Sequence, residues 1–176
     1  MSQRITPREI AITALMIALV AVVTRFLIVP IGAGFFNLSD AAVYFTAFTF
    51  GPWIGFLAGG IGAALADLSA GYASFAPLTF MAHGLQGLVA GFIVLRGPGS
   101  LVTRMILGAV AGTLAMTGVY FAGEYFGANL GWGGPTQALT ELPFNLLQNV
   151  IGAAIAIPLS ILVRRAYPPL NRYTGE

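Results

Sequence analysis

The chain has 176 residues, is 57% hydrophobic and only 8% charged, and has a mean hydropathy of +0.86. A soluble domain of this size carries about a quarter charged residues, so a lipid bilayer is the expected solvent. The net charge is +2, and all eight basic residues are arginines without a long run, which excludes a typical nucleic-acid-binding surface. The chain has no cysteine, so it forms no disulfide and no thiolate metal site.

Apolar segments of membrane-spanning length follow one another along the chain. A span needs about 20 mostly apolar residues. The first segment lacks a small-x-small cleavage signal before its polar end and is followed by more spans, so we expect a helix and not a signal peptide. Segments two and three are short, so they are tilted or embedded among longer neighbours. We predict an all-α integral membrane bundle, one domain over 1–176, of six transmembrane helices at 10–29, 35–50, 53–68, 78–95, 101–122 and 142–163.

The arginines predict the orientation of this bundle. With six spans, seven arginines fall on the side of both termini, and only Arg25 falls on the other side. Because arginine is enriched in cytoplasmic loops, both termini are expected in the cytoplasm. The outward connections are then 30–39, 69–76 and 123–139, which are long and rich in glycine and aromatic residues.

The last predicted helix carries a polar stripe. Glu141, Asn145 and Gln148 stand at i, i+4 and i+7, so they share one face over about 10 Å. Pro143 is expected in the first turn of this helix. Polar side chains at membrane depth face the bundle or a wet cavity. They either join helices by hydrogen bonds or bind a ligand, and three on one stripe favour the ligand.

The fourth predicted helix adds His83 and Gln86, three residues apart on one face. His83 is the only histidine and has no cysteine beside it, so we expect no metal site and no cofactor. Both side chains can donate and accept hydrogen bonds, which favours direct contact with a substrate.

Other candidates lie at the outer ends of the spans. Asp67 could cap backbone amides, pair with Arg25 or contact a ligand, and Asp40 could be an ordinary first-turn helix residue. Aromatic side chains there could stack on a flat ring or simply anchor the membrane interface; these are Phe36, Tyr72, Tyr125 and Trp132.

Small residues form stripes on several helices. Ala11, Ala14, Ala18 and Ala21 make one on the first helix, which either packs internally or meets a partner protein. Glycine-containing stripes at 55–63 and 108–112 are expected to pack helices closely. No nucleotide-binding loop or hydrolase motif is present in the sequence, so the chain is not expected to be an enzyme.

With these residues in view, the chain resembles the substrate-binding S components of energy-coupling-factor (ECF) vitamin transporters, over nearly its whole length. The nearest branch is the hydroxymethylpyrimidine- and pyridoxine-type one. The resemblance rests on the order and spacing of several segments: Phe36-Asn37-Leu38-Ser39-Asp40, Phe50-Gly51-Pro52, Gly59-Gly60-Ile61-Gly62, Ala66-Asp67-Leu68, Gly71-Tyr72, Ala76-Pro77, Gly84-Leu85-Gln86-Gly87, Glu124-Tyr125-Phe126 and 141–148.

The resemblance implies a multi-pass protein in the cytoplasmic membrane of a prokaryote. It implies capture of a vitamin or precursor from outside, and partnership with a T subunit and two ABC ATPases. Ala14 and Ala18 match the family's patch for the T subunit. The ligand residues that it implies are Asn37, Asp67, Tyr72, Glu141, Asn145 and Gln148. This chain has His83 and Gln86 where relatives of this branch often have Lys and Glu.

The sequence therefore predicts the substrate-binding subunit of an ECF-type ABC importer for a small heterocyclic vitamin or precursor. The alternative function is a self-sufficient channel or secondary carrier, which would transport without ATPase partners. A structural membrane subunit would bind no small molecule at all. The complete set of predicted substrate-binding residues is Asn37, Asp67, Tyr72, His83, Gln86, Tyr125, Trp132, Glu141, Asn145 and Gln148.

Overall fold

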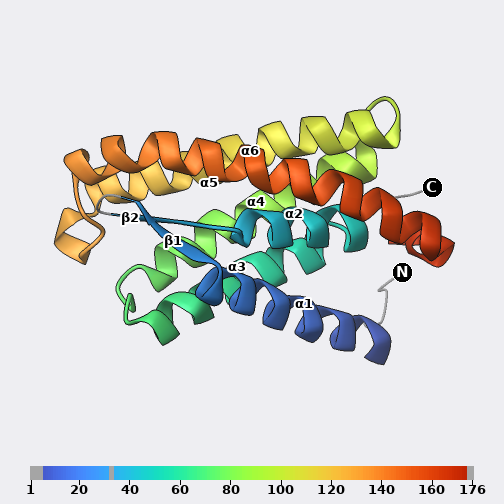
Figure 1. Ribbon diagram of the computed structural model, residues 1–176, viewed down its shortest axis with the longest axis horizontal. Coiled ribbons are helices and arrows are strands. Elements are labelled where there is room, and N and C mark those ends of the chain that lie inside the picture. The colour runs from blue at the N-terminus through green and yellow to red at the C-terminus, as the bar shows by residue number, and fades with distance from the viewer. Residues whose placement is uncertain (1–5, 32–33, 174–176) are drawn as a thin grey trace.

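The computed structural model describes residues 6–31 and 34–173. In this part of the chain six α-helices lie in a bundle, with one two-stranded hairpin at its edge (Figure 1). The elements are α1 (Pro7–Phe26), β1 (Ile28–Ile31), β2 (Gly34–Asn37), α2 (Ser39–Phe50), α3 (Pro52–Ala70), α4 (Ala76–Arg96), α5 (Leu101–Phe126), η1 (Ala128–Leu130), α6 (Pro135–Ala166) and η2 (Pro168–Tyr173).

Five of the described helices are long and apolar enough to cross a membrane: α1, α3, α4, α5 and α6. Helix α2 has only 12 residues, which is about 18 Å of helix and less than the hydrocarbon core. Nine of these residues are buried, including Tyr44 and Phe48. Helix α2 is therefore embedded among its longer neighbours, one of the two arrangements expected for the short second segment.

The hairpin corrects the predicted boundaries of the first two spans. Helix α1 ends at Phe26 rather than near Val29, and the residues from Gly34 to Asn37 form β2 rather than the start of a helix. The strands pair antiparallel, with Val29 opposite Phe36. Pro30 explains the change, because proline disfavours helix at the preceding residue, and the β-branched residues beside it suit a strand.

Helix α6 corrects a second boundary. It begins at Pro135 rather than near 142, so Pro143 lies inside the helix and not in its first turn. Pro135 occupies the first turn instead, where its missing N–H costs nothing. The polar segment 135–141 escaped a search for apolar runs, although it is helical, because it extends the helix beyond the apolar part.

Helices α3 and α4 approach so closely that their backbones touch. A Cβ on Gly59 would lie 2.5 Å from the carbonyl oxygen of His83, and one on Gly87 would lie 2.4 Å from that of Gly55. Real side-chain contacts are never this short, so glycine is required at the crossing. The packing role predicted for Gly55 and Gly59 is confirmed, and the crossing fixes the register of α4, including His83.

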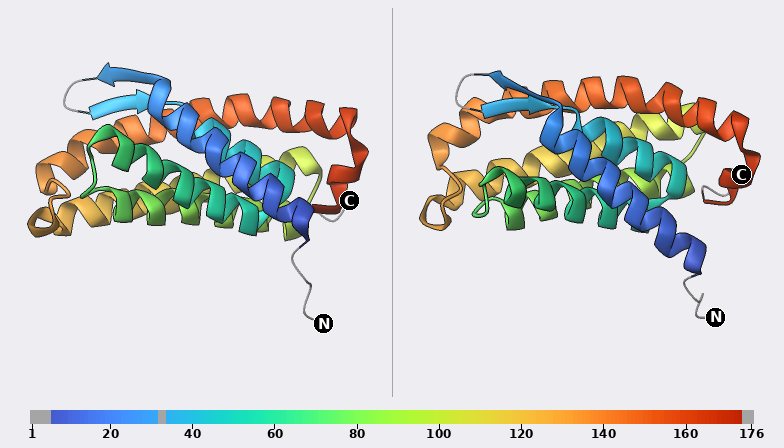
Figure 2. Two further views of the ribbon diagram at one scale, coloured as in Figure 1. Left: turned by 90° about the horizontal axis from the view of Figure 1, so that it is seen from below. Right: turned by 60° about the horizontal axis from the view of Figure 1, so that its bottom comes forward.

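The two ends of the bundle differ in character. Both termini of the described chain lie at one end, and the hairpin and the α3–α4 and α5–α6 loops lie at the other (Figure 2). Arg8, Arg96, Arg164 and Arg165 stand in the helix ends beside the termini. Arg25 lies in the last turn of α1, at the hairpin end.

Candidate binding cavity

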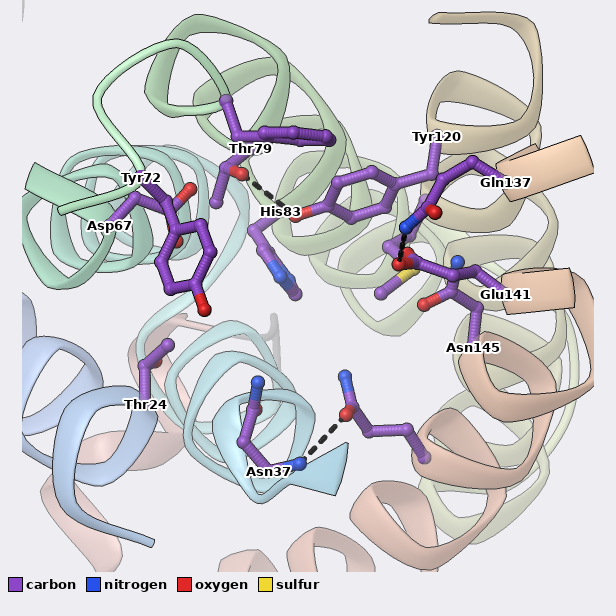
Figure 3. Close-up of a pocket in the computed structure, with 13 residues that line it drawn as sticks. Thr24, Asn37, Asp67, Tyr72, Thr79, His83, Tyr120, Gln137, Glu141 and Asn145 are labelled. Atoms are coloured by element: carbon purple, nitrogen blue, oxygen red, sulfur yellow. Dashed lines mark hydrogen bonds between the residues drawn. The ribbon is translucent and has the colours of Figure 1, made fainter. Parts of the chain in front are cut away.

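A cavity of about 130 Å³ opens in the bundle half away from the termini. Its wall combines the end of α1, the hairpin, the α3–α4 region, α5 and α6, so residues far apart in the sequence face one space (Figure 3). The lining residues are Thr24, Asn37, Asp67, Tyr72, Phe75, Thr79, His83, Met116, Tyr120, Gln137, Glu141, Asn145 and Gln148.

Helix α6 forms one polar wall of the cavity. Glu141, Asn145 and Gln148 line it together, as the i, i+4, i+7 spacing predicts for one helix face. Gln137 lies one turn earlier, and its side-chain amide donates a hydrogen bond to the Glu141 carboxylate. The backbone N–H of Asn37 donates to Gln148 Oε1 at 2.9 Å. Gln148 thus ties the hairpin to this wall.

The facing wall comes from α3, α4 and α5. The Tyr120 hydroxyl donates to Thr79 Oγ1 at 2.9 Å, and the His83 and Tyr120 rings meet edge to face with centroids 5.8 Å apart. Asp67 is 8% exposed, and its Oδ2 atom has no hydrogen-bond partner. In Figure 3 Tyr72 lies next to Asp67, beside the open centre of the cavity. This wall offers aromatic surface and an unsatisfied acceptor.

A buried polar network lies behind His83. Its Nδ1 is 2.9 Å from Gln86 Oε1, and Gln86 Nε2 donates to Asp40 Oδ1 at 2.6 Å and to Asn149 Oδ1 at 2.8 Å. The Tyr44 hydroxyl also donates to Asn149 Oδ1, at 2.6 Å. Asp40, Gln86 and Asn149 are fully buried, so the network joins α2, α4 and α6 away from solvent. It fixes the orientation of His83 in the cavity wall.

Seven of the ten predicted site residues line the cavity, and three do not. Gln86 lies behind His83, in the network just described. Tyr125 is 40% exposed and stacks on Phe121 with ring centroids 5.8 Å apart. The Trp132 indole donates to the carbonyl oxygen of Ser74 at 2.6 Å, which links the two outer loops. Substrate contact by these three stays a prediction from the sequence.

Six lining residues were not predicted: Thr24, Phe75, Thr79, Met116, Tyr120 and Gln137. Thr79 and His83 are four residues apart on one helix face, as are Gln137 and Glu141, so that periodicity was available in the sequence. Thr24 and Met116 look like ordinary residues of apolar helices, and only the tertiary fold brings them to the cavity.

The first helix presents its small residues to the outside. Ala11, Ala14 and Ala18 are all exposed on α1, whose buried residues are Met16, Val20 and Thr24. Among residues 6–31 and 34–173, no cluster of three or more His, Asp or Glu side chains could hold a metal ion.

The chain is similar to known proteins in sequence and in fold. Residues 4–165 match the family described as "ECF-type riboflavin transporter, S component". The chain is 30% identical over 161 residues to the thiamine precursor transporter HmpT of Lactococcus lactis, covering 90% of this chain and 89% of that protein. It is 32% identical over 153 residues to an uncharacterised protein of Pyrococcus woesei, covering 86% and 98%. A solved structure of the S component of a bacterial ECF transporter has the same fold, with a TM-score of 0.71 at 22% identity, over 93% of this chain and 97% of that one.

Proposed function

Since the chain belongs to the family of ECF-type riboflavin transporter S components, we propose that it captures a small one-ring heterocycle from outside the cell, a vitamin or vitamin precursor of the hydroxymethylpyrimidine or pyridoxine kind. As an S component it is the substrate-binding subunit of an ABC importer and not an enzyme. Family membership disfavours the alternative of a self-sufficient channel or carrier. The observation that carries the proposal is the cavity, lined by seven of the ten polar and aromatic residues predicted from the sequence.

The proposed orientation puts both termini in the cytoplasm of a prokaryotic cell and the cavity on the outside. Its support is the concentration of arginines at the terminal end of the bundle. We also propose that α2 completes the predicted six-helix transmembrane domain as a helix surrounded by protein. Non-helical backbone at membrane depth is tolerated where protein buries it, and Asn37, just before the N-cap residue Leu38, is buried.

The proposed substrate is small because the cavity is small. Its volume of about 130 Å³ lies below the range of about 300–1,000 Å³ that holds drug-sized ligands. A one-ring pyrimidine or pyridine suits that space better than a three-ring flavin with its sugar-alcohol chain. The name of the HmpT relative, a thiamine precursor transporter, supports the same substrate class.

Binding in this proposal combines stacking with hydrogen bonds. Tyr72, Phe75 and Tyr120 offer aromatic faces, and Asn145 and Gln148 offer amide donors and acceptors on the opposite wall. An analogue that lacks one matching group leaves a buried polar atom unpaired, which is how such a site discriminates.

The proposed partners are a T subunit and two ABC ATPase subunits. The exposed Ala14 and Ala18 on α1 support a contact between this helix and the T subunit. Small side chains let helices approach closely inside a membrane, where lipid gives apolar contact no advantage.

The test is ligand binding by the purified protein. Mass spectrometry of co-purifying small molecules identifies the natural ligand, and titration calorimetry with hydroxymethylpyrimidine, pyridoxine and riboflavin ranks the candidates. Asn145→Ala and Gln148→Ala are each expected to weaken binding at least about fivefold, since each removes a hydrogen-bonding group worth about 1–3 kcal/mol.

Asn129→Ala is the matched control, because Asn129 is an exposed amide in η1, near the same end of the bundle but outside the cavity. It should change affinity less than twofold. Binding that survives both cavity substitutions unchanged would refute the site, and preference for riboflavin would refute the one-ring substrate.

A further inference from the structure

Two acidic side chains without a neighbouring arginine mark the cavity wall. Asp67 and Glu141 line it, and no arginine is among the described lining residues. The nearest arginine in the sequence is Arg25, which follows the lining residue Thr24, but its guanidinium lies over the Phe26 ring, 5.6 Å from the centroid. Lysine is absent from the chain.

His83, a basic side chain of the wall, lies against an acid. Its Nδ1 is 3.6 Å from Asp40 Oδ1, and Asp40 is fully buried behind the cavity. The cavity presents acceptors and acidic groups to any ligand.

A buried carboxyl group of this wall, Asp67, has an oxygen, Oδ2, without a hydrogen-bond partner. Glu124 does not line the cavity, but it interacts with Glu141, which does. A buried acceptor without a donor costs about 1–3 kcal/mol, so a ligand that brings N–H or O–H groups gains what the empty wall lacks.

The opposite holds for an anionic ligand. Its charge would enter a space at membrane depth beside carboxyl groups, with no guanidinium or ammonium to pair with it. A buried anion without a partner of opposite charge is costly in such a low-dielectric site, since water solvates it poorly there.

We infer that this cavity selects neutral or cationic ligands rich in N–H and O–H donors and rejects their phosphorylated or carboxylated forms. The inference rests on the proposed function and narrows its substrate class. An aminopyrimidine alcohol or an aminomethylpyridine fits this description. The phosphate esters of the same rings do not fit it, and neither does a pyridine carboxylic acid.

The first experiment uses the unmodified protein in detergent and matched pairs of probes in titration calorimetry. The pairs are hydroxymethylpyrimidine with its phosphate monoester, and pyridoxamine with pyridoxamine phosphate. Each phosphate is expected to bind at least about tenfold more weakly than its parent. The neutral dimethyl ester of the first phosphate has similar bulk without the charge, and should bind more tightly than the charged monoester.

A second experiment neutralises the wall. Glu141→Gln and Asp67→Asn keep the shape of each side chain and should lower the preference for parent over phosphate by at least about tenfold. Glu9→Gln is the charge-matched control, because Glu9 lies in the first turn of α1, about 22 Å along the helix from Thr24. It should leave the preference unchanged.

The outcomes separate this inference from the proposed function. If neither parent compound nor any vitamin of the panel binds the unmodified protein, the proposed function fails and the inference with it. If the parents bind and the phosphates bind equally well, only the inference is wrong. Equal rejection of the monoester and its neutral dimethyl ester would assign the selection to size and would also overturn it.

Discussion

Replacing Gln86 by leucine tests whether the buried network behind the cavity holds the site in shape. The substitution keeps most of the side-chain volume but removes three interactions of a fully buried amide. These are the bonds to Asp40 Oδ1, to Asn149 Oδ1 and with His83 Nδ1, at 2.6, 2.8 and 2.9 Å. Gln86 does not line the cavity, so any effect on a ligand must be indirect, through lining residues such as His83.

The expected loss of stability follows from the partners left behind. Asn149 Oδ1 keeps the Tyr44 hydroxyl as a donor, but Asp40 Oδ1 and His83 Nδ1 lose the Gln86 amide and stand 3.6 Å apart, too far for a hydrogen bond with each other. Two unsatisfied buried groups cost about 2–6 kcal/mol in a soluble protein. Hydrogen bonds between membrane helices contribute less, because chains unfolded in the membrane also find partners. We therefore expect a destabilisation of about 2 kcal/mol.

Denaturant unfolding of the purified protein in detergent measures this loss, and calorimetry with hydroxymethylpyrimidine or pyridoxine measures affinity. Thr46→Val is the matched control, because Thr46 is also fully buried but donates only to the carbonyl of Ala42 in its own helix. It should cost less than about 1 kcal/mol and leave affinity unchanged. If Gln86→Leu is no less stable than Thr46→Val, the network does not hold the helices together as argued.

Two further predictions concern packing and partnership. In the same unfolding assay, Gly59→Ala should destabilise the protein by about 1–3 kcal/mol, because the new Cβ would lie 2.5 Å from the His83 carbonyl oxygen. Gly118→Ala is the control: a Cβ there meets nothing within 4 Å, so this change should be neutral or slightly stabilising. Ala14→Leu and Ala18→Leu should abolish co-purification with the T and ATPase subunits but leave ligand affinity unchanged. Leu15→Ala is the control, at a neighbouring residue that is 64% exposed, and this variant should still co-purify with the partner subunits. Assembly of the leucine variants would exclude this face of α1 as the interface.

The apolar runs predicted most helices because a span leaves a strong signal in one dimension. Helices α3, α4 and α5 begin within two residues of the predicted positions and end within about four. The hairpin was missed because an apolar strand of four residues, such as Ile28–Ile31, cannot be distinguished by hydropathy from the end of an apolar helix. Only the proline at position 30 marked the change.

The site was predictable where one helix carries several of its residues. Glu141, Asn145 and Gln148 line the cavity together because helical periodicity alone puts them on one face. Sequence reasoning could not separate His83, which lines the cavity, from Gln86, which lies behind it, since both stand on the same side of α4. Which of two neighbouring polar residues reaches the open space depends on how α2 and α6 pack against α4, and no local pattern encodes that.

The short helix α2 links the fold to the cavity. Asn37 lines the cavity just before α2 begins at Ser39, while no residue of α2 itself does. A helix that starts at this depth leaves donors unpaired in its first turn, and in a membrane these need partners from protein. Asn37 Oδ1 accepts from the Ser39 N–H at 2.7 Å, and Gln148 accepts from the N–H of Asn37 itself. Because α2 is short, a space remains beyond its N-terminal end, and the unpaired donors of its first turn require polar side chains around that space. Such a polar space inside a membrane protein can hold a hydrogen-bonding ligand.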